Sequence, residues 1–243
     1  MITVENVEFG RKTFRINGIS FKIYDGKING IGGLNGSGKT TILNIMYGFL
    51  KANDGAVYID GKNLQAMKVK DVAKYISVVH QETPNPMNFT VYDVISLSGY
   101  SREKNGLTVD QSLELCKISE LKTRQYSELS GGEKRMVLFA AALFQDSKYV
   151  MLDEPFTFLD VDKMMRVSEI IKRMRDMGKT IVIVLHDVNQ LYNLCDNVIL
   201  LKAGKKIAEG EPDKVMNSKI LYEVYGVNFS DYDSVEGKRF YPV

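Results

Sequence analysis

The chain has 243 residues, 44% of them apolar and 26% charged, which is the usage of an ordinary globular protein with enough chain to bury a sizeable core. Its 32 lysines and arginines nearly balance 30 aspartates and glutamates, for a net charge of +2, so composition gives no support for a nucleic-acid-binding protein. The two cysteines, Cys116 and Cys195, lie in no CxxC pair. This argues against a zinc site or a disulfide framework and favours two reduced thiols.

We expect neither a membrane span nor a signal peptide. The longest uninterrupted apolar run, residues 136–144, is far shorter than the roughly 20 residues of a spanning helix. The first residues show no basic segment followed by an apolar stretch. No repeat, low-complexity tract or Ser/Gly-rich linker divides the chain, so we expect a single domain over residues 1–243.

The first third of the chain is predicted to be mostly strands. One helix is expected over residues 41–50, where apolar residues recur at helical spacing. Asp25-Gly26 and Asp60-Gly61 are turn signals. The predicted strands are 2–7, 19–24, 27–32, 56–59 and 75–79.

The pattern then becomes helical from about residue 83 to 148 and alternates afterwards. The predicted helices are 91–98, 109–117, 133–145 and 163–177. Apolar strands are predicted at 149–152 and 180–185, and a hairpin at 198–209 around Ala203-Gly204. Apolar strands that alternate with helices indicate a parallel sheet covered on both faces. The tail, 213–243, is expected to be a short helix followed by irregular, aromatic-rich chain.

A glycine-rich segment, residues 33–40, reads Gly-Leu-Asn-Gly-Ser-Gly-Lys-Thr and fits GxxxxGK[ST] between a predicted strand and helix. Glycines let backbone N–H groups approach a phosphate, and the helix start directs its positive end at the same anion. Lys39 adds a full charge, and the Thr40 hydroxyl is a ligand for Mg²⁺. The predicted nucleotide-binding residues here are Asn35, Gly36, Ser37, Gly38, Lys39, Thr40 and Thr41.

Two carboxylates, Asp153 and Glu154, follow the apolar residues 149–152. Ligands bind at the C-terminal edge of strands in open α/β sheets. Asp153 is predicted to hold Mg²⁺ through water, and Glu154 to polarise the attacking water as general base. Alone, such a pair is more often a solvated strand end; a phosphate-binding segment in the same chain favours the catalytic interpretation.

A second predicted anion-binding helix start is the string Leu129-Ser130-Gly131-Gly132-Glu133. Ser130 is a good N-cap, and the glycines expose backbone amides where the helix over 133–145 begins. By itself, the string is more typical of an ordinary capped helix.

Taken together, the phosphate segment, the LSGGE string and the acid pair resemble the ATP-binding-cassette (ABC) ATPases over nearly the whole chain. The resemblance implies an α/β fold: a P-loop NTPase core with a mostly parallel sheet and an N-terminal antiparallel β subdomain. It also implies an α-helical subdomain inserted at about residues 83–148, and ATP and Mg²⁺ as ligands.

The same resemblance gives roles to residues that carry none by themselves. Gln81 matches the Q-loop and would reach Mg²⁺. Residues 158–160 match the D-loop, with Asp160 at the nucleotide. His186 matches the switch histidine, which contacts the γ-phosphate, and is the second catalytic residue beside Glu154.

Phe9 lies where the family stacks an aromatic ring on adenine. A core position is the common alternative for such a residue, and Phe14 is a second candidate for the base. Three segments depart from the family pattern: Leu34 replaces a frequent proline, 156–158 is bulkier than usual, and 134–136 reads Lys-Arg-Met. The first departure affects the stiffness of the phosphate loop, the second the packing of the D-loop, and the third only the detailed contacts after the LSGGE string.

In the family, two subunits pack head to tail, so that each ATP lies between one phosphate loop and residues 130–133 of the other subunit. Such a homodimer has two-fold symmetry. Hydrolysis removes the γ-phosphate bridge and opens the dimer. The presence of Glu154 indicates turnover rather than a purely regulatory site.

One cassette with a full helical insert resembles the separate ATPase subunit of a transporter, whose insert meets a cytoplasmic helix of a permease. Residues 86–94, followed by Ser98-Gly99-Tyr100, and tail residues 221–227 resemble importers of iron–siderophore, haem and cobalamin type, although the arginine expected near 98–100 is absent. This implies metal-chelate import, an indirect substrate-binding-protein partner, and a peripheral location on the cytoplasmic side of the cell membrane.

The main alternative is a soluble ABC ATPase of the iron–sulfur-cluster assembly type, against which the tail and residues 86–94 argue. Chromosome or repair ATPases insert long coiled coils that this chain has no room for, and fused translation factors have two cassettes. A nucleotide-sensing module is expected to lack Glu154 or His186, and both are present. No nucleic-acid partner is expected.

Overall fold

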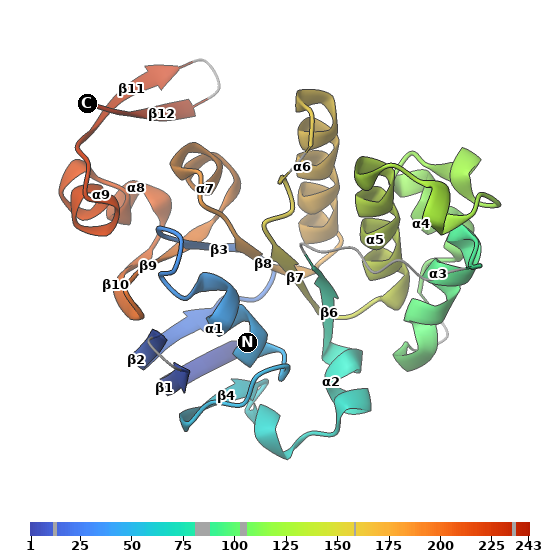
Figure 1. The fold of residues 1–243 in the computed structure, drawn as a ribbon, viewed down its shortest axis with the longest axis horizontal. Coiled ribbons are helices and arrows are strands. Elements are labelled where there is room, and N and C mark those ends of the chain that lie inside the picture. Colours follow the sequence, from blue (N-terminus) through green and yellow to red (C-terminus); the bar gives the residue numbers. More distant parts are fainter. Residues whose placement is uncertain (12–13, 81–87, 103–105, 158, 235–236) are drawn as a thin grey trace. The chain divides into compact units, whose positions relative to one another are not determined.

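The computed structural model describes residues 1–11, 14–80, 88–102, 106–157, 159–234 and 237–243. They form two compact units, the first made of Met1–Met67 and Val182–Val243 and the second of Lys68–Ile181 (Figure 1). Strand β8 (Thr180–Val184) is divided at the boundary between the units.

An antiparallel sheet opens the first unit. Its strands, in the order β2-β1-β4-β5, are β2 (Phe14–Ile23), β1 (Ile2–Arg11), β4 (Asp54–Ile59) and β5 (Lys62–Asn63). The antiparallel N-terminal subdomain is therefore confirmed, with β1 and β2 longer than predicted. Alternate apolar side chains of β1, such as Ile2 and Val4, are buried, which is the pattern of a sheet with one covered face.

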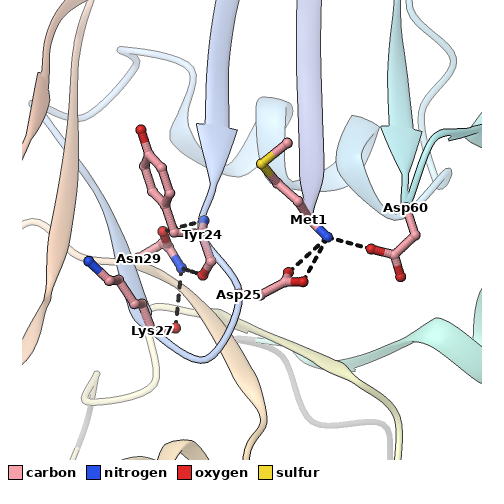
Figure 2. A network of polar contacts seen from close by, with 6 residues as sticks. All are labelled: Met1, Tyr24, Asp25, Lys27, Asn29 and Asp60. Atoms are coloured by element: carbon pink, nitrogen blue, oxygen red, sulfur yellow. Dashed lines mark hydrogen bonds and ion pairs between the residues drawn. The ribbon is translucent and has the colours of Figure 1, made fainter.

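Polar contacts hold the turn after β2 and the start of β1 (Figure 2). The buried Asn29 accepts the Tyr24 N–H at 3.0 Å and donates its amide to the carbonyls of Tyr24 and Lys27. The Met1 amino group lies beside the carboxylates of Asp25 and Asp60. The buried Asn29 side chain thus satisfies backbone groups of the exposed turn between β2 and β3.

Strand β3 (Ile28–Gly32) leads into the glycine-rich segment and is buried along its length. It pairs in parallel with β9 (Asn197–Lys202), which pairs antiparallel with β10 (Lys205–Gly210). Helix α1 (Lys39–Met46) follows. The prediction that this helix reaches residue 50 is wrong, because Tyr47 is already non-helical and Gly48 adopts φ +82°, a conformation that ends helices.

The C-terminal region contains more regular structure than predicted. Its elements are α7 (Val188–Leu194), α8 (Pro212–Val215), α9 (Ser218–Tyr225), β11 (Phe229–Ser234) and β12 (Gly237–Pro242). The same unit contains a short 3₁₀ turn after β5, η1 (Leu64–Ala66). The expectation of an irregular tail is wrong. Phe240 is buried, its backbone exchanges two hydrogen bonds with the Asn189 side chain, and its ring meets Tyr192 edge-on. This contact with α7 stabilises a hairpin that the local pattern does not reveal.

The second unit is mainly helical, as predicted. Its elements are α2 (Val69–Tyr75), β6 (Ile76–Val79), α3 (Val91–Ser98), η2 (Gly99–Ser101), α4 (Val109–Leu115), η3 (Ser119–Leu121), η4 (Tyr126–Glu128), α5 (Gly131–Gln145), β7 (Tyr149–Asp153) and α6 (Val161–Asp176). Strands β6 and β7 are parallel. Helix α2 was not predicted, and none of its residues is buried, so it lacks the apolar stripe on which the prediction depends.

In the described part of the second unit, capping boxes start helices α3, α4 and α5. In each, the N-cap hydroxyl accepts the backbone N–H three residues on, and that residue's side chain accepts the N-cap N–H. The pairs are Thr90 with Asp93, Thr108 with Gln111, and Ser130 with Glu133. Together, the parallel strand pairs, the antiparallel sheet and the helices confirm the α/β fold class. Among the described residues, no helix combines the length and apolarity needed to cross a bilayer.

Candidate functional site

The phosphate loop, residues 33–40, leaves β3 and enters α1 in the first unit. Its glycines adopt conformations that side chains rarely take, with φ +142° at Gly33, +77° at Gly36 and +106° at Gly38. A Cβ on Gly33 would lie 2.2 Å from the Leu201 carbonyl oxygen, so this position tolerates only glycine. Gly204, in the turn between β9 and β10, also contacts the loop, because its N–H donates to the Ser37 carbonyl at 3.0 Å.

Polar groups that suit a phosphate lie at this loop. Helix α1 has no side-chain cap, in contrast to the three helices with capping boxes, so no capping side chain competes with an anion at its start. The Ser37 hydroxyl is buried without a hydrogen-bond partner among the described residues. Lys39 is only 5% exposed, and its ammonium donates to the carbonyls of Gly33 (2.9 Å) and Leu34 (3.1 Å). A buried cation beside an uncapped helix start fits a phosphate group.

Of the remaining predicted loop residues, Asn35, Gly36 and Thr40 are exposed and Thr41 is half-buried. Thr40, the predicted Mg²⁺ ligand of the loop, therefore lies at the surface.

The two aromatic candidates for adenine lie on one face of the β1–β2 pair. Phe9 is paired with Ile16, and Phe14 with Arg11; directly paired residues share a face of the sheet. A Cβ at Gly38 would meet Phe14 Cζ at 3.0 Å and Ile16 Cγ1 at 3.6 Å. The structure therefore places Phe14, the first residue of β2, against the phosphate loop, while Phe9 lies on β1; both residues are half-buried.

His186 is exposed and lies two residues after β8, and the residue between them, Leu185, donates its N–H to the Ile31 carbonyl of β3 at 3.1 Å. Because β3 leads into the phosphate loop, the segment that carries His186 is held at the same strand edge. Asp187 then caps α7 by accepting the Gln190 N–H at 2.7 Å.

The acid pair lies in the second unit, at the end of the fully buried strand β7. Asp153 is 7% exposed. Glu154 has φ +46°, a left-handed conformation that costs energy for a residue with a side chain and clusters at functional sites. The Thr157 hydroxyl donates to the Glu154 carboxylate at 3.3 Å, and the Thr157 N–H to the Glu154 carbonyl at 3.2 Å. This turn fixes the backbone that carries the predicted base.

Arg135 is a buried charge that the sequence analysis did not single out. It lies on α5 and is 4% exposed, and its guanidinium donates to the His80 carbonyl at 2.5 Å. Burial lowers its pKa, while Tyr126 and Asp153 raise it. Burial raises the pKa of Tyr126 to about 12 against the opposing charge of Arg135. Its place directly before the apolar run of residues 136–144 was the available signal, since a charge that is buried needs a partner.

The signature segment, residues 129–133, closes on itself through its capping box. Both the N–H and the hydroxyl of Ser130 donate to one oxygen of Glu133, at 2.8 and 2.7 Å. These bonds lower the pKa of the Glu133 carboxyl, and Arg124 and Lys163 lower it further. The segment thus joins an anionic side chain to a helix start with two adjacent glycines.

Asp160 caps α6, accepting the Lys163 N–H at 2.9 Å, and its second oxygen accepts the Lys163 ammonium at 2.9 Å. Hydrogen bonds from Lys163 lower the pKa of Asp160. The Lys163 side chain also lies against Gly132, 2.8 Å from the position of a Cβ there. Lys163 was missed by the sequence analysis; its spacing of three residues from Asp160 was the available signal.

The predicted site residues therefore form two sets. The phosphate loop, Phe14 and His186 belong to the first unit, and the acid pair, the signature segment and Asp160 to the second. Gln81 and Phe158 lie outside the described residues.

Comparisons with known proteins agree on one family. The family model described as ABC transporter matches residues 16–157, more than half of the chain. The petrobactin import ATP-binding protein YclP of Bacillus subtilis is 32% identical over 234 residues, 93% of this chain and 92% of the relative. The iron(3+)-hydroxamate import ATP-binding protein FhuC of the same organism is 32% identical over 222 residues, 88% of this chain and 82% of the relative.

Solved structures show the same fold. An inward-facing transporter of the metal-chelate type superposes with a TM-score of 0.84 at 22% identity, over 100% of this chain and 97% of that one. The dimeric bacterial ABC cassette MJ0796 superposes with a TM-score of 0.76 at 26% identity, over 87% and 99%. Import ATP-binding subunits of this kind dimerise and work with membrane permeases. This chain belongs to the ABC transporter family, as an ATP-binding subunit that hydrolyses ATP with Mg²⁺.

Proposed function

We propose that this chain is the subunit whose ATP hydrolysis powers import of a metal chelate, of the iron–siderophore, haem or cobalamin type, through a membrane permease. The observation that carries the proposal is the near full-length match to siderophore import ATP-binding proteins. The phosphate loop supports it, because an uncapped α1 beside the buried Lys39 suits a nucleotide phosphate. Both relatives reported above are transporter subunits, so the iron–sulfur assembly alternative gains no support.

In the proposed mechanism, Lys39 and the loop N–H groups bind the phosphates, and Glu154 acts as the general base. Thr40, Gln81 and Asp153 would hold Mg²⁺, which supplies charge neutralisation at the β- and γ-phosphates. His186 would contact the γ-phosphate.

We further propose a head-to-tail homodimer in which the signature segment of one subunit completes the site of the other. Two helix N-termini, α1 of one subunit and α5 of the other, would then share one triphosphate. For Ser130 to donate to a phosphate oxygen, its hydroxyl must leave Glu133, which it now contacts at 2.7 Å.

The proposed permease-facing surface lies on the second unit. Val69, Leu97 and Tyr100 are 88%, 62% and 81% exposed, and the Lys70 ammonium lies 4.9 Å from the Tyr100 ring, so α2 and η2 are neighbours. Exposed apolar side chains that gather in this way are typical of protein–protein contacts. The proposed location is accordingly the cytoplasmic face of the cell membrane, as a peripheral subunit.

The test is native purification of the tagged chain from detergent-solubilised membranes, with mass spectrometry of the bound proteins. We expect to recover a multi-span permease in a one-to-one ratio with this chain. The gene of that permease is expected to lie beside a gene for a chelate-binding protein. A variant with Val69→Glu and Tyr100→Glu should lose the permease and keep its ATPase activity. Tyr222→Glu, at an exposed tyrosine of the other unit, is the matched control. Recovery of scaffold proteins from the cytosolic fraction alone would contradict the transporter assignment.

A further inference from the structure

Lys163, in the first turn of α6, lies at the start of α5. Its Cδ, Cε and Nζ atoms would be 2.8, 3.0 and 3.1 Å from a Cβ on Gly132, so the end of the side chain lies against that glycine. The ammonium forms an ion pair with the Asp160 carboxylate at 2.9 Å. One side chain therefore contacts both the signature segment and the D-loop aspartate.

Two carboxylates at the signature segment each have a cation beside them. Glu133 lies 3.6 Å from the Arg124 guanidinium, and Asp160 lies 2.9 Å from the Lys163 ammonium. A carboxylate beside a triphosphate repels it and counteracts the attraction of a helix start. The two cations therefore neutralise negative charge at the segment that, in the proposed dimer, receives a phosphate.

The fold of α6 does not depend on this ion pair. Its side chains are 36% exposed for Lys163 and 58% for Asp160, and exposed ion pairs contribute little to the free energy of unfolding. Asp160 caps the helix through its other oxygen, which accepts the Lys163 N–H at 2.9 Å, so the cap does not need the ammonium.

The place of the ammonium is also unfavourable for helix formation. Lys163 belongs to the first turn of α6 and lies against Gly132 in the first turn of α5. Helix N-termini attract anions and repel cations. A role in binding an anion explains this position of a lysine better than a role in folding does.

We propose that Lys163 is a positioning residue for the nucleotide held by the other subunit. Its ammonium neutralises Asp160 and its alkyl chain lies against Gly132, so the signature segment and Asp160 meet the triphosphate as one unit. The proposal rests on the head-to-tail dimer proposed above. It adds to that site a residue that lies outside the LSGGE string and the D-loop.

The test measures ATP-driven dimerisation of the full chain by light scattering, in a Glu154→Gln background in which hydrolysis is expected to be slow. Lys163→Met removes the charge and keeps an unbranched side chain against Gly132. Lys172→Met, at an exposed lysine of the same helix, changes the net charge equally and is the matched control. Lys163→Arg keeps the charge.

We expect Lys163→Met to raise the ATP concentration for half-maximal dimerisation about fivefold, the upper range for one exposed ion pair. Its Tm should equal that of Lys172→Met. In dimerisation, Lys172→Met and Lys163→Arg should both match the Glu154→Gln parent.

A second background tests whether Asp160 is the group that Lys163 neutralises. Asparagine caps helices as aspartate does but carries no charge. In an Asp160→Asn background, Lys163→Met should therefore affect dimerisation no more than Lys172→Met does. An undiminished effect of Lys163→Met in that background would overturn the proposal, because the ammonium would then act without Asp160.

Two further results count against the role of Lys163. One is an equal ATP requirement of Lys163→Met and Lys172→Met. The other is a lower Tm of Lys163→Met with unchanged dimerisation, because the lysine would then only stabilise the start of α6. If the Glu154→Gln parent binds ATP without dimerising, the head-to-tail dimer itself fails, and the role of Lys163 falls with it.

Discussion

Gly132 and Lys163 are in direct contact across the start of α5. A Cβ on Gly132 would lie 2.8 Å from Lys163 Cδ and 3.1 Å from its Nζ, whereas a Cβ on Gly131 would meet nothing within 4 Å. The Lys163 ammonium also contacts Asp160 at 2.9 Å. The signature segment and the D-loop aspartate are therefore connected inside one subunit through a lysine side chain.

Gly132→Ala is expected to displace Lys163, and Gly131→Ala is not. Alanine favours a helix over glycine by up to about 1 kcal/mol, so Gly131→Ala should raise the free energy of unfolding by up to about that amount. Gly132→Ala should raise the free energy of unfolding by less, because the Lys163 side chain must move away from Asp160. Urea unfolding measures both. In the double variant Gly132→Ala, Lys163→Ala, the alanine at 132 should stabilise the helix by as much as Gly131→Ala does. Equal increases in the free energy of unfolding for the two single glycine variants would contradict the contact between Gly132 and Lys163.

Glu154→Gln is expected to bind ATP but to accumulate as a closed dimer. Glutamine keeps the shape of the side chain and cannot accept the proton of the attacking water, so kcat should fall by about 10²- to 10⁴-fold. ATPase assays and light scattering with ATP test both effects. Glu169→Gln, at an exposed α6 carboxylate, is the control. Wild-type turnover in Glu154→Gln would remove Glu154 from the role of base.

Phe14→Leu is expected to weaken ATP binding more than Phe9→Leu does, because Phe14 is the ring that touches the phosphate loop. Stacking of a base on an aromatic ring contributes about 1–3 kcal/mol. Titrations with ATP and with tripolyphosphate, which has no base, distinguish contacts to the base from contacts to the phosphates. Phe14→Leu should bind ATP more weakly and tripolyphosphate as tightly as the wild type does. If Phe9→Leu rather than Phe14→Leu weakens binding of ATP but not of tripolyphosphate, Phe9 is the residue that stacks on adenine.

Gly204→Ala is expected to destabilise the chain much more than Gly61→Ala. The two glycines have nearly equal φ, +72° and +79°, but a Cβ on Gly204 would lie 1.8 Å from the Arg15 carbonyl oxygen, while one on Gly61 meets nothing. Gly61→Ala should cost about 1 kcal/mol from backbone strain. Gly204→Ala should cost about 3 kcal/mol or more and lower ATP affinity, since Gly204 holds the Ser37 carbonyl. Similar unfolding midpoints for the two would contradict this.

The two buried thiols should make stability fall at alkaline pH. Burial raises the pKa of Cys116 from 9.0 to about 12 and also raises that of Cys195. The folded chain therefore holds these protons more tightly than the unfolded chain. Their contribution is complete below about pH 9 and is lost as pH rises toward about 12.

Urea unfolding at increasing pH measures this loss, and Cys116→Ala should give a shallower decline above about pH 9. At about pH 8, alkylation should label both thiols only after unfolding. Rapid labelling of the folded chain would show that the thiols are accessible. If the free energy of unfolding of Cys116→Ala declines with pH as steeply as that of the wild type, folding does not raise the pKa of Cys116.

Motifs with their own local chemistry were predictable. The glycines of the phosphate loop need positive φ, and Ser130 with Glu133 forms a capping box, whatever the rest of the chain does. Apolar spacing placed α3 at its observed bounds, and it placed α5 and β7 nearly so. Helix α2 and the β11–β12 hairpin were missed, because the helix has no buried stripe and the hairpin depends on Phe240 packing against α7.

The sequence by itself determined the family, the order of the motifs and the strands and helices that carry them, since glycine requirements, caps and apolar periods act within a few residues. Only the tertiary structure decided which side chains from distant segments meet. It placed Phe14 at Gly38, Arg135 at the His80 carbonyl and the Tyr225 hydroxyl beside Gly32. These contacts join residues far apart in the chain, and close packing rather than any local pattern selects them.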